Sequence, residues 1–213
     1  MARTLTTGRA ARIAARKNEW AQSTSGVADT YLQANLLVLP SRYAEDFRQL
    51  CARNPVPCPF IAESTNPGDF AILKLPQVRD EELTADLDLR TDCPRYNVYA
   101  EGKLAHTAVD DILSQWTSDH VAFVIGCSQS IESALIRAGV EMRHLNPQRT
   151  VPMYRTKLPL NPSGIFTSST YVVSMRPFRK QDIEAGAANY ETLLAYPWRA
   201  NQVGMGCFGA TWY

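Results

Sequence analysis

Arginines beside turns are the first residues of this sequence that could do chemistry. In the stretch "DLRTDCPRYNVY", Arg90 and Arg95 bracket a Thr-Asp-Cys-Pro turn. Arginine presents a planar fork that matches a carboxylate through two parallel hydrogen bonds, so several forks would suit a small acidic substrate. The arginines beside a turn or a strand end are Arg90, Arg95, Arg143, Arg155 and Arg176. The alternative for any one of these arginines is a surface salt bridge. In the turn between Arg90 and Arg95, the alternative is that Asp92 forms an Asx-turn and pairs with one of these two arginines.

A second candidate is the stretch "GCSQS", which follows an apolar run from Val121 to Ile125. The pattern predicts a buried strand, a tight turn and then a helix. Ligands usually bind at this edge of an α/β sheet, and a helix N-terminus suits an anion and lowers the pKa of a thiol. Ser128 is therefore a candidate ligand and Cys127 a candidate nucleophile. The alternative is a small buried cysteine, with Ser128 or Ser130 as the helix N-cap.

Two further side chains could carry protons. Tyr154 stands next to Arg155, and His144 stands next to Arg143. A tyrosine can pass a proton and a histidine titrates near neutral pH, although both residue types also serve as hydrogen-bonded structural groups. The five cysteines include no C-x-x-C pair and the three histidines are separated, so local spacing predicts no zinc site.

The elements that must position these residues alternate between strand and helix. The apolar patterns predict strands over 36–39, 60–62, 97–100 and 121–125, one or two strands over 164–177, and helices over 41–54 and 131–138. Ser41 is the expected cap of the first helix, Asn54 its end, and Glu101-Gly102 a hairpin turn. This alternation predicts an α/β fold with a mixed sheet or sheets and flanking helices.

Composition excludes several classes of protein. The chain has 213 residues, 20% charged residues and a net charge of +1. We expect no binding of nucleic acid and, since no apolar run approaches about 18 residues, no membrane span. Residues 1–18 are basic and free of acids, which is typical of a mitochondrial transit segment. We favour a basic first helix that packs Leu5, Ile13 and its alanines on the domain, in a cytoplasmic protein.

Several blocks of this sequence resemble the D-glutamate cyclase family of hydro-lyases. They are "YLQANLLVLP", "NPVPCPFIAES", "DLRTDCPRYNVYAEG", "DHVAFVIGCSQSIESALIRAGVEMRH", "VPMYRT" and "VVSMRP", and together they cover about residues 30–178. The resemblance implies an α/β enzyme that converts D-glutamate to 5-oxo-D-proline and water, without metal or cofactor. Its partner would be a small amino dicarboxylate substrate, and a homo-oligomer is compatible with this function.

The implied reaction needs a carboxylate clamp, a base for the amine and an acid or oxyanion site for the departing oxygen. The expected substrate-binding residues are Arg90, Arg95, Ser128, Arg143, Arg155 and Arg176. The expected catalytic residues are Cys127, Glu132, His144 and Tyr154. Which of the last three carries the proton stays open.

Two departures from the family pattern define the alternative function. Gln129 and Ile131 stand where the family usually has aromatic residues, and the family continues past "VSMRP" with blocks that 179–213 does not resemble. We therefore expect three parts: a basic helix or arm over 1–29, a cyclase-like domain over 30–178, and a divergent, truncated tail over 179–213. The alternative is an inactive remnant that binds a small carboxylate.

Overall fold

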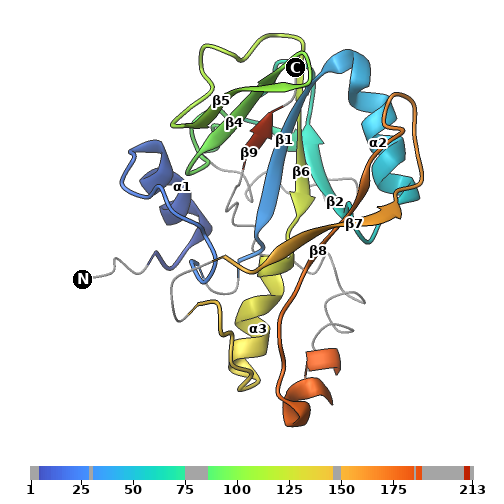
Figure 1. Ribbon diagram of the computed structural model, residues 1–213. Coiled ribbons are helices and arrows are strands. Elements are labelled where there is room, and N and C mark those ends of the chain that lie inside the picture. Colours follow the sequence, from blue (N-terminus) through green and yellow to red (C-terminus); the bar gives the residue numbers. More distant parts are fainter. Residues whose placement is uncertain are drawn as a thin grey trace.

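The computed structural model describes residues 5–28, 31–74, 86–145, 150–184, 186–188 and 209–211. The helices are α1 (Gly8–Arg16), α2 (Ala44–Arg53) and α3 (Glu132–Arg137), with short 3-10 turns η1 (Ser41–Tyr43), η3 (Ser128–Ile131) and η4 (Lys180–Asp182). The strands are β1 (Ala34–Pro40), β2 (Phe60–Ser64), β3 (Leu73–Lys74), β4 (Tyr96–Ala100), β5 (Lys103–Val109), β6 (His120–Gly126), β7 (Met153–Pro159), β8 (Thr170–Ser174) and β9 (Gly209–Thr211). Within the described residues, seven strands form one sheet in the order β3-β2-β6-β1-β9-β4-β5, and β7 and β8 form a separate ribbon (Figure 1).

The sheet is mixed, as the sequence predicts. Strand β9 runs parallel to both β1 and β4, and the other neighbouring strands are antiparallel. The predicted α/β fold with flanking helices is therefore confirmed, and the segments 36–39, 60–62, 97–100 and 121–125 all lie in strands. Glu101 and Gly102 form the β4–β5 turn with φ of 51° and 74°, the left-handed geometry that a tight hairpin turn requires.

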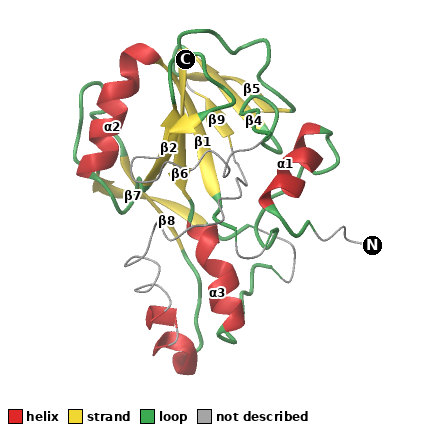
Figure 2. Ribbon diagram, turned by 180° about the vertical axis from the view of Figure 1, so that it is seen from behind, coloured by secondary structure: helices red, strands yellow, loops and turns green. Residues whose placement is uncertain are grey.

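Alternating side chains of β1 and β6 build two cores on opposite faces of the sheet. On one face, Leu39 and Phe123 pack against the apolar side of α2, where the Phe47 and Phe123 ring centroids lie 4.8 Å apart. On the other face, Leu36 and Val124 pack against the segment that leads into β4. Figures 1 and 2 show α2 and α1 on opposite sides of the molecule. The center of the sheet is thus buried on both faces, which explains its nearly continuous apolar strands.

Helix α2 starts differently from the prediction. The Ser41 hydroxyl donates to the Asp119 carboxylate, and Ser41 begins the turn η1 rather than capping α2. The helix does end before Asn54, as expected, and the Asn54 amide donates to the Leu50 carbonyl at 2.8 Å. The side chain of Asn54 therefore satisfies a carbonyl that the end of the helix leaves unpaired.

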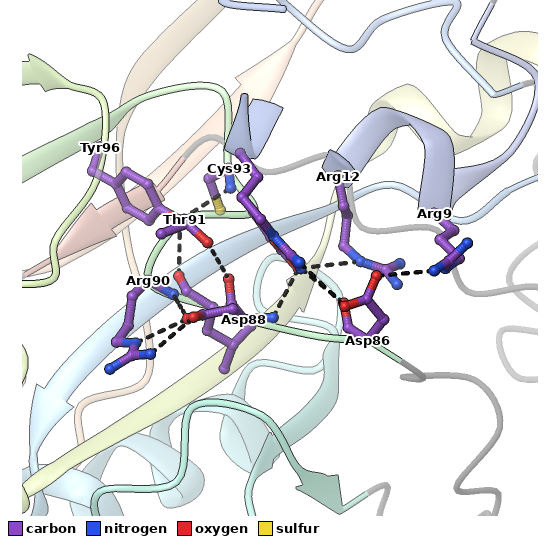
Figure 3. Close-up of polar contacts among 11 residues, drawn as sticks. Arg9, Arg12, Asp86, Asp88, Arg90, Thr91, Cys93 and Tyr96 are labelled. Carbon is purple, nitrogen blue, oxygen red and sulfur yellow. Dashed lines mark hydrogen bonds and ion pairs between the residues drawn. The ribbon is translucent and has the colours of Figure 1, made fainter. Parts of the chain in front are cut away.

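The basic helix α1 is part of the domain. Its alanines at 11, 14 and 15 are buried, as expected, but so is Arg12. The Nε atom of Arg12 lies 3.3 Å from the buried Asp92 carboxylate, which also pairs with Arg16 at 2.8 Å. Figure 3 shows Arg9 and Arg12 next to Asp86, on the opposite side of Asp88 from Arg90. The predicted pairing of Asp92 with Arg90 or Arg95 is therefore wrong, because Arg12 and Arg16 of α1 are the charged partners of this carboxylate.

Part of the predicted tail lies outside the described residues. Of 179–213, the structure describes 179–184, 186–188 and 209–211, so the prediction of a divergent tail stays a prediction. In the described ranges, no helix is long and apolar enough to cross a membrane.

Candidate functional site

A buried polar cluster lies where β6 and β8 end. We call it the Glu132 cluster, and its residues are Ser25, Ser128, Glu132, His144, Ser174 and Arg176. Strand β6 leads through Cys127 into η3 and α3, which carry Ser128 and Glu132. Strand β8 ends at Ser174, and the chain continues to Arg176. Figure 1 shows α3 below the end of β6, next to the β7–β8 ribbon.

The Glu132 carboxylate is the center of the cluster. It is 1% exposed. Its Oε1 atom accepts from Arg176 Nη2 at 2.6 Å and Nε at 3.1 Å, and lies 3.0 Å from His144 Nε2. Its Oε2 atom accepts from the Ser25 hydroxyl at 2.6 Å. A buried carboxylate is tolerated when such charge-assisted hydrogen bonds offset the loss of hydration.

Arg176 connects this buried pair to hydroxyl groups nearer the surface. Its Nη1 atom donates to the Ser174 hydroxyl at 2.9 Å, and Nη2 donates to the Ser128 carbonyl at 3.1 Å. The Ser128 and Ser174 hydroxyls lie 2.9 Å apart, and Ser128 is exposed. The cluster thus has a charged interior, formed by Glu132 and Arg176, and an accessible polar rim, formed by the Ser128 and Ser174 hydroxyls.

Hydrogen bonds to Gln33 fix the turn that carries Cys127 and Ser128. The Cys127 amide donates to the Gln33 carbonyl at 3.2 Å, and the Ser130 hydroxyl donates to the same oxygen at 2.9 Å. The Ser130 hydroxyl also accepts from the Gln33 amide at 2.8 Å. The alternative role of Ser128 or Ser130 as a helix N-cap is wrong, because η3 precedes α3 and neither has a side-chain cap. Ser130 instead anchors the turn to the segment before β1.

Cys127 differs from the reactive thiolate that the sequence predicted. Burial raises the pKa of its thiol, and the hydrogen bond from the Gln129 amide opposes this only in part. The expectation that a helix start lowers this pKa is therefore wrong, because desolvation outweighs the local amide. At neutral pH the Cys127 side chain is a thiol, which can donate a hydrogen bond.

Arg90 and Arg95 serve carboxylates of the chain itself. Arg90 pairs with Asp88 at 2.9 Å (Figure 3). Its guanidinium also lies 3.4 Å from the center of the Phe70 ring. Arg95 pairs with Asp110 at 2.9 Å. Both precede β4, which β9 and β1 separate from β6 in the sheet. The structure thus does not bring them to the Glu132 cluster, and their role in substrate binding stays a prediction.

The remaining predicted residues are not members of the cluster. Tyr154 and Arg155 lie on β7, opposite Val173 and Val172 of β8, and both are exposed. Arg143 is also exposed, next to the buried His144. Their predicted roles remain untested.

Sequence reasoning missed two members of the cluster. Ser174 lies two residues before Arg176 in "VVSMRP", so its place in a strand leading to a predicted arginine was a usable signal. Ser25 stands 107 residues before Glu132, in a polar loop without a motif, and no local signal could have found it.

Residues 121–194 match a family model described as D-glutamate cyclase. This range holds every member of the Glu132 cluster except Ser25.

Curated relatives extend the similarity beyond this range. A protein of Pelagibacter ubique named "Putative hydro-lyase" is 43% identical over 172 residues, which are 81% of this chain and 61% of the relative. Another of the same name, from Aliivibrio fischeri, is 44% identical over 78% of this chain and 59% of the relative. A third, from Schizosaccharomyces pombe, is 42% identical over 82% of this chain and 55% of its own length.

These matches define a class of proteins named as hydro-lyases. The chain is similar to these proteins over about four-fifths of its length, and over residues 121–194 to the D-glutamate cyclase family. It spans about three-fifths of the length of the curated relatives it matches, from 55% to 61% in the three above.

Proposed function

We propose that this chain acts as a hydro-lyase that cyclises D-glutamate to 5-oxo-D-proline and water. The observation that carries the proposal is the Glu132 cluster, which joins a buried Arg176–Glu132 pair, a histidine and an accessible hydroxyl rim. Similarity to the D-glutamate cyclase family and to proteins named as hydro-lyases supports the reaction class. The choice of D-glutamate follows the description of the family.

The reaction balances with one group that both takes and returns protons. The amine nitrogen of the substrate attacks the carbon of its side-chain carboxylate, a C–N bond forms and one C–O bond breaks. The ammonium nitrogen gives up two protons, and both end on the departing oxygen, which leaves as water. The site must therefore bind the substrate in a folded conformation and relay protons from nitrogen to oxygen.

His144 is the residue we assign to this relay. A carboxylate can only accept hydrogen bonds, so the contact of Nε2 with Glu132 favours the tautomer that carries its proton on Nε2. The Nδ1 atom is then the nitrogen that accepts a proton from the substrate amine. Glu132 holds the ring in place, as a second group often does for a catalytic histidine.

The rim of the cluster supplies the carboxylate contacts. The Ser128 and Ser174 hydroxyls bind a carboxylate of the substrate, and Arg176 behind them holds both groups through its Nη atoms. The neighbouring Cys127 donates a hydrogen bond from its protonated thiol to the departing oxygen. In this assignment Arg176 organises the rim, and Glu132 balances its buried charge.

The first test is incubation of the purified, folded chain with D-glutamate, and with L-glutamate as control, followed by chiral separation of 5-oxoproline. Product from the D-isomer alone supports the proposal. Calorimetric binding of D-glutamate without turnover, by a chain that circular dichroism shows to be folded, would instead support a non-catalytic carboxylate-binding protein.

Two variants and one control test the residue assignments. His144→Gln should lower kcat strongly with little change in KM, while His106→Gln, on exposed β5, should retain activity. Arg155→Ala tests the predicted clamp on β7. Unchanged turnover and unchanged D-glutamate binding in Arg155→Ala would remove this residue from the site, and unchanged kcat in His144→Gln would refute the relay.

A further inference from the structure

Two cysteine side chains meet at the end of α2, away from the groups assigned to the reaction. Cys51 lies in the last turn of the helix and is 2% exposed. Cys58 lies in the following turn and is partly exposed. Both side chains pack in the apolar core around Phe47 and Phe123, where each thiol shifts the pKa of the other through a side-chain hydrogen bond, and both cysteines are free in this structure.

The chain between them is built to keep the thiols together. The Cys58 amide donates to the Asn54 carbonyl at 3.0 Å, which closes the turn after the helix. The Asn54 side chain is itself fixed by the Leu50 carbonyl and by the Asn161 backbone. Pro57 and Pro59 restrict the backbone on each side of Cys58, and Pro55 restricts it directly after Asn54. Bringing the two sulfur atoms into bonding distance therefore requires little further loss of conformational freedom.

The contact makes the two thiols chemically unequal. The hydrogen bond from Cys51 lowers the pKa of Cys58, and the same contact raises the pKa of Cys51. The more exposed sulfur is thus also the one more readily ionised, and ionisation and access together govern attack on a disulfide.

The turn that carries Cys58 touches the strand that leads to the Glu132 cluster. The Pro59 carbonyl accepts from the Gly126 amide at 2.8 Å. A Cβ atom at Gly126 would lie 3.0 Å from Cγ of Pro59, so the proline ring packs directly on this glycine. Gly126 immediately precedes Cys127. Pro59 directly follows Cys58, so a covalent change at Cys58 lies one residue from the contact between Pro59 and Gly126.

We propose that Cys51 and Cys58 form a reversible disulfide by exchange with a small-molecule disulfide, and that this bond holds the 54–59 turn against Gly126. The Cys58 thiolate attacks one sulfur of the small disulfide and releases the first small thiolate, which takes up a proton. The Cys51 thiol then loses its proton and attacks the Cys58 sulfur, releasing the second small thiol. The protein loses two electrons and two protons, and the small disulfide gains them.

The test uses the complete folded chain in mixtures of oxidised and reduced glutathione, followed by alkylation and peptide mapping. We expect a peptide linked through Cys51 and Cys58 as the main oxidised product, and its full loss after dithiothreitol. A chain in which Cys58 stays reduced, or in which Cys58 crosslinks to another cysteine, would overturn the proposal. This chemistry does not depend on the proposed function, so failure of either leaves the other standing.

Two cysteine variants sharpen this result. In Cys51→Ala the second step is blocked, so a stable mixed disulfide with glutathione should accumulate at Cys58. In Cys127→Ala, the control, the Cys51–Cys58 crosslink should form as in the parent chain. Equal yields of mixed disulfide in the parent and in Cys51→Ala would show that Cys51 is not the resolving thiol, and would overturn the proposal.

Hydrogen exchange measures the link to the site. The Gly126 amide donates to Pro59, so its exchange should slow severalfold when the crosslink holds the turn in place. The amide of Lys103, an exposed residue at the start of β5, serves as the reference, and its exchange should not change. If the Gly126 amide exchanges at the same rate in the oxidised and reduced chains, the disulfide does not hold the 54–59 turn against Gly126, and that part of the proposal is refuted.

Discussion

Removal of the Glu132 carboxylate should destabilise the fold more than a change at any exposed ion pair. The side chains of Glu132 and Arg176 are 1% and 2% exposed, so Glu132→Ala leaves the charge of Arg176 buried without its partner. Breaking a buried pair in this way costs about 3–5 kcal/mol. For a domain of this size the loss corresponds to a fall in Tm of about 6–20 °C.

The assay is urea unfolding of the parent chain and variants at neutral pH, followed by circular dichroism. The double variant Glu132→Leu/Arg176→Met should recover much of the loss, because it removes both buried charges at similar volume. Glu141→Ala is the matched control: its partner Arg179 is 57% exposed, so the change should stay within about 0.5 kcal/mol. A loss below about 1 kcal/mol for Glu132→Ala, the size typical of exposed pairs, would refute the reasoning, as would a double variant no more stable than the single one.

Three further predictions concern other parts of the structure. Asp92→Ala removes the buried carboxylate that pairs with α1, so the free energy of unfolding measured in urea should fall by about 3–5 kcal/mol. The exposed Asp86→Ala should lower it by less than about 1 kcal/mol. Equal losses in the two variants would contradict the role of Asp92 in holding α1. Phe47→Ala removes an edge-to-face contact in the core and should cost about 3–5 kcal/mol; a near-neutral effect would show that this core is not packed as described. Burial raises the pKa of Cys127 above its ordinary 9.0, so its alkylation by iodoacetamide should be slow at pH 7 and still increase above pH 9; a rate that levels off below pH 8 would mean a lowered pKa.

The sequence predicted the local elements well because their signals are local. The apolar run predicted as a strand over 121–125 is a buried strand, and the helix predicted over 41–54 buries Phe47, Leu50 and Cys51. The turn at Glu101-Gly102 followed from the same kind of short-range rule.

The site was only partly predictable, because its contacts join distant parts of the chain. Ser128, Glu132, His144 and Arg176 were selected by residue type and family pattern, and the structure brings them together. The partners of Asp92 lie on α1, 76 residues from Asp92 in the case of Arg16, whereas sequence reasoning considered only its neighbours. The pKa of Cys127 depends on burial, which no short motif encodes.

The position of β9 has a consequence for the order in which the sheet is assembled. This strand comes last along the described chain, yet it pairs with both β1 and β4 in the interior of the sheet. During synthesis, β3-β2-β6-β1 and β4-β5 can form as separate pieces, but they cannot be joined by backbone hydrogen bonds within one sheet until residues 209–211 have left the ribosome. Until then β1 and β4 each present an unpaired backbone edge, which is a template for pairing with another chain. Contacts between such distant segments also form slowly, so nascent copies should depend on chaperones until this strand is in place.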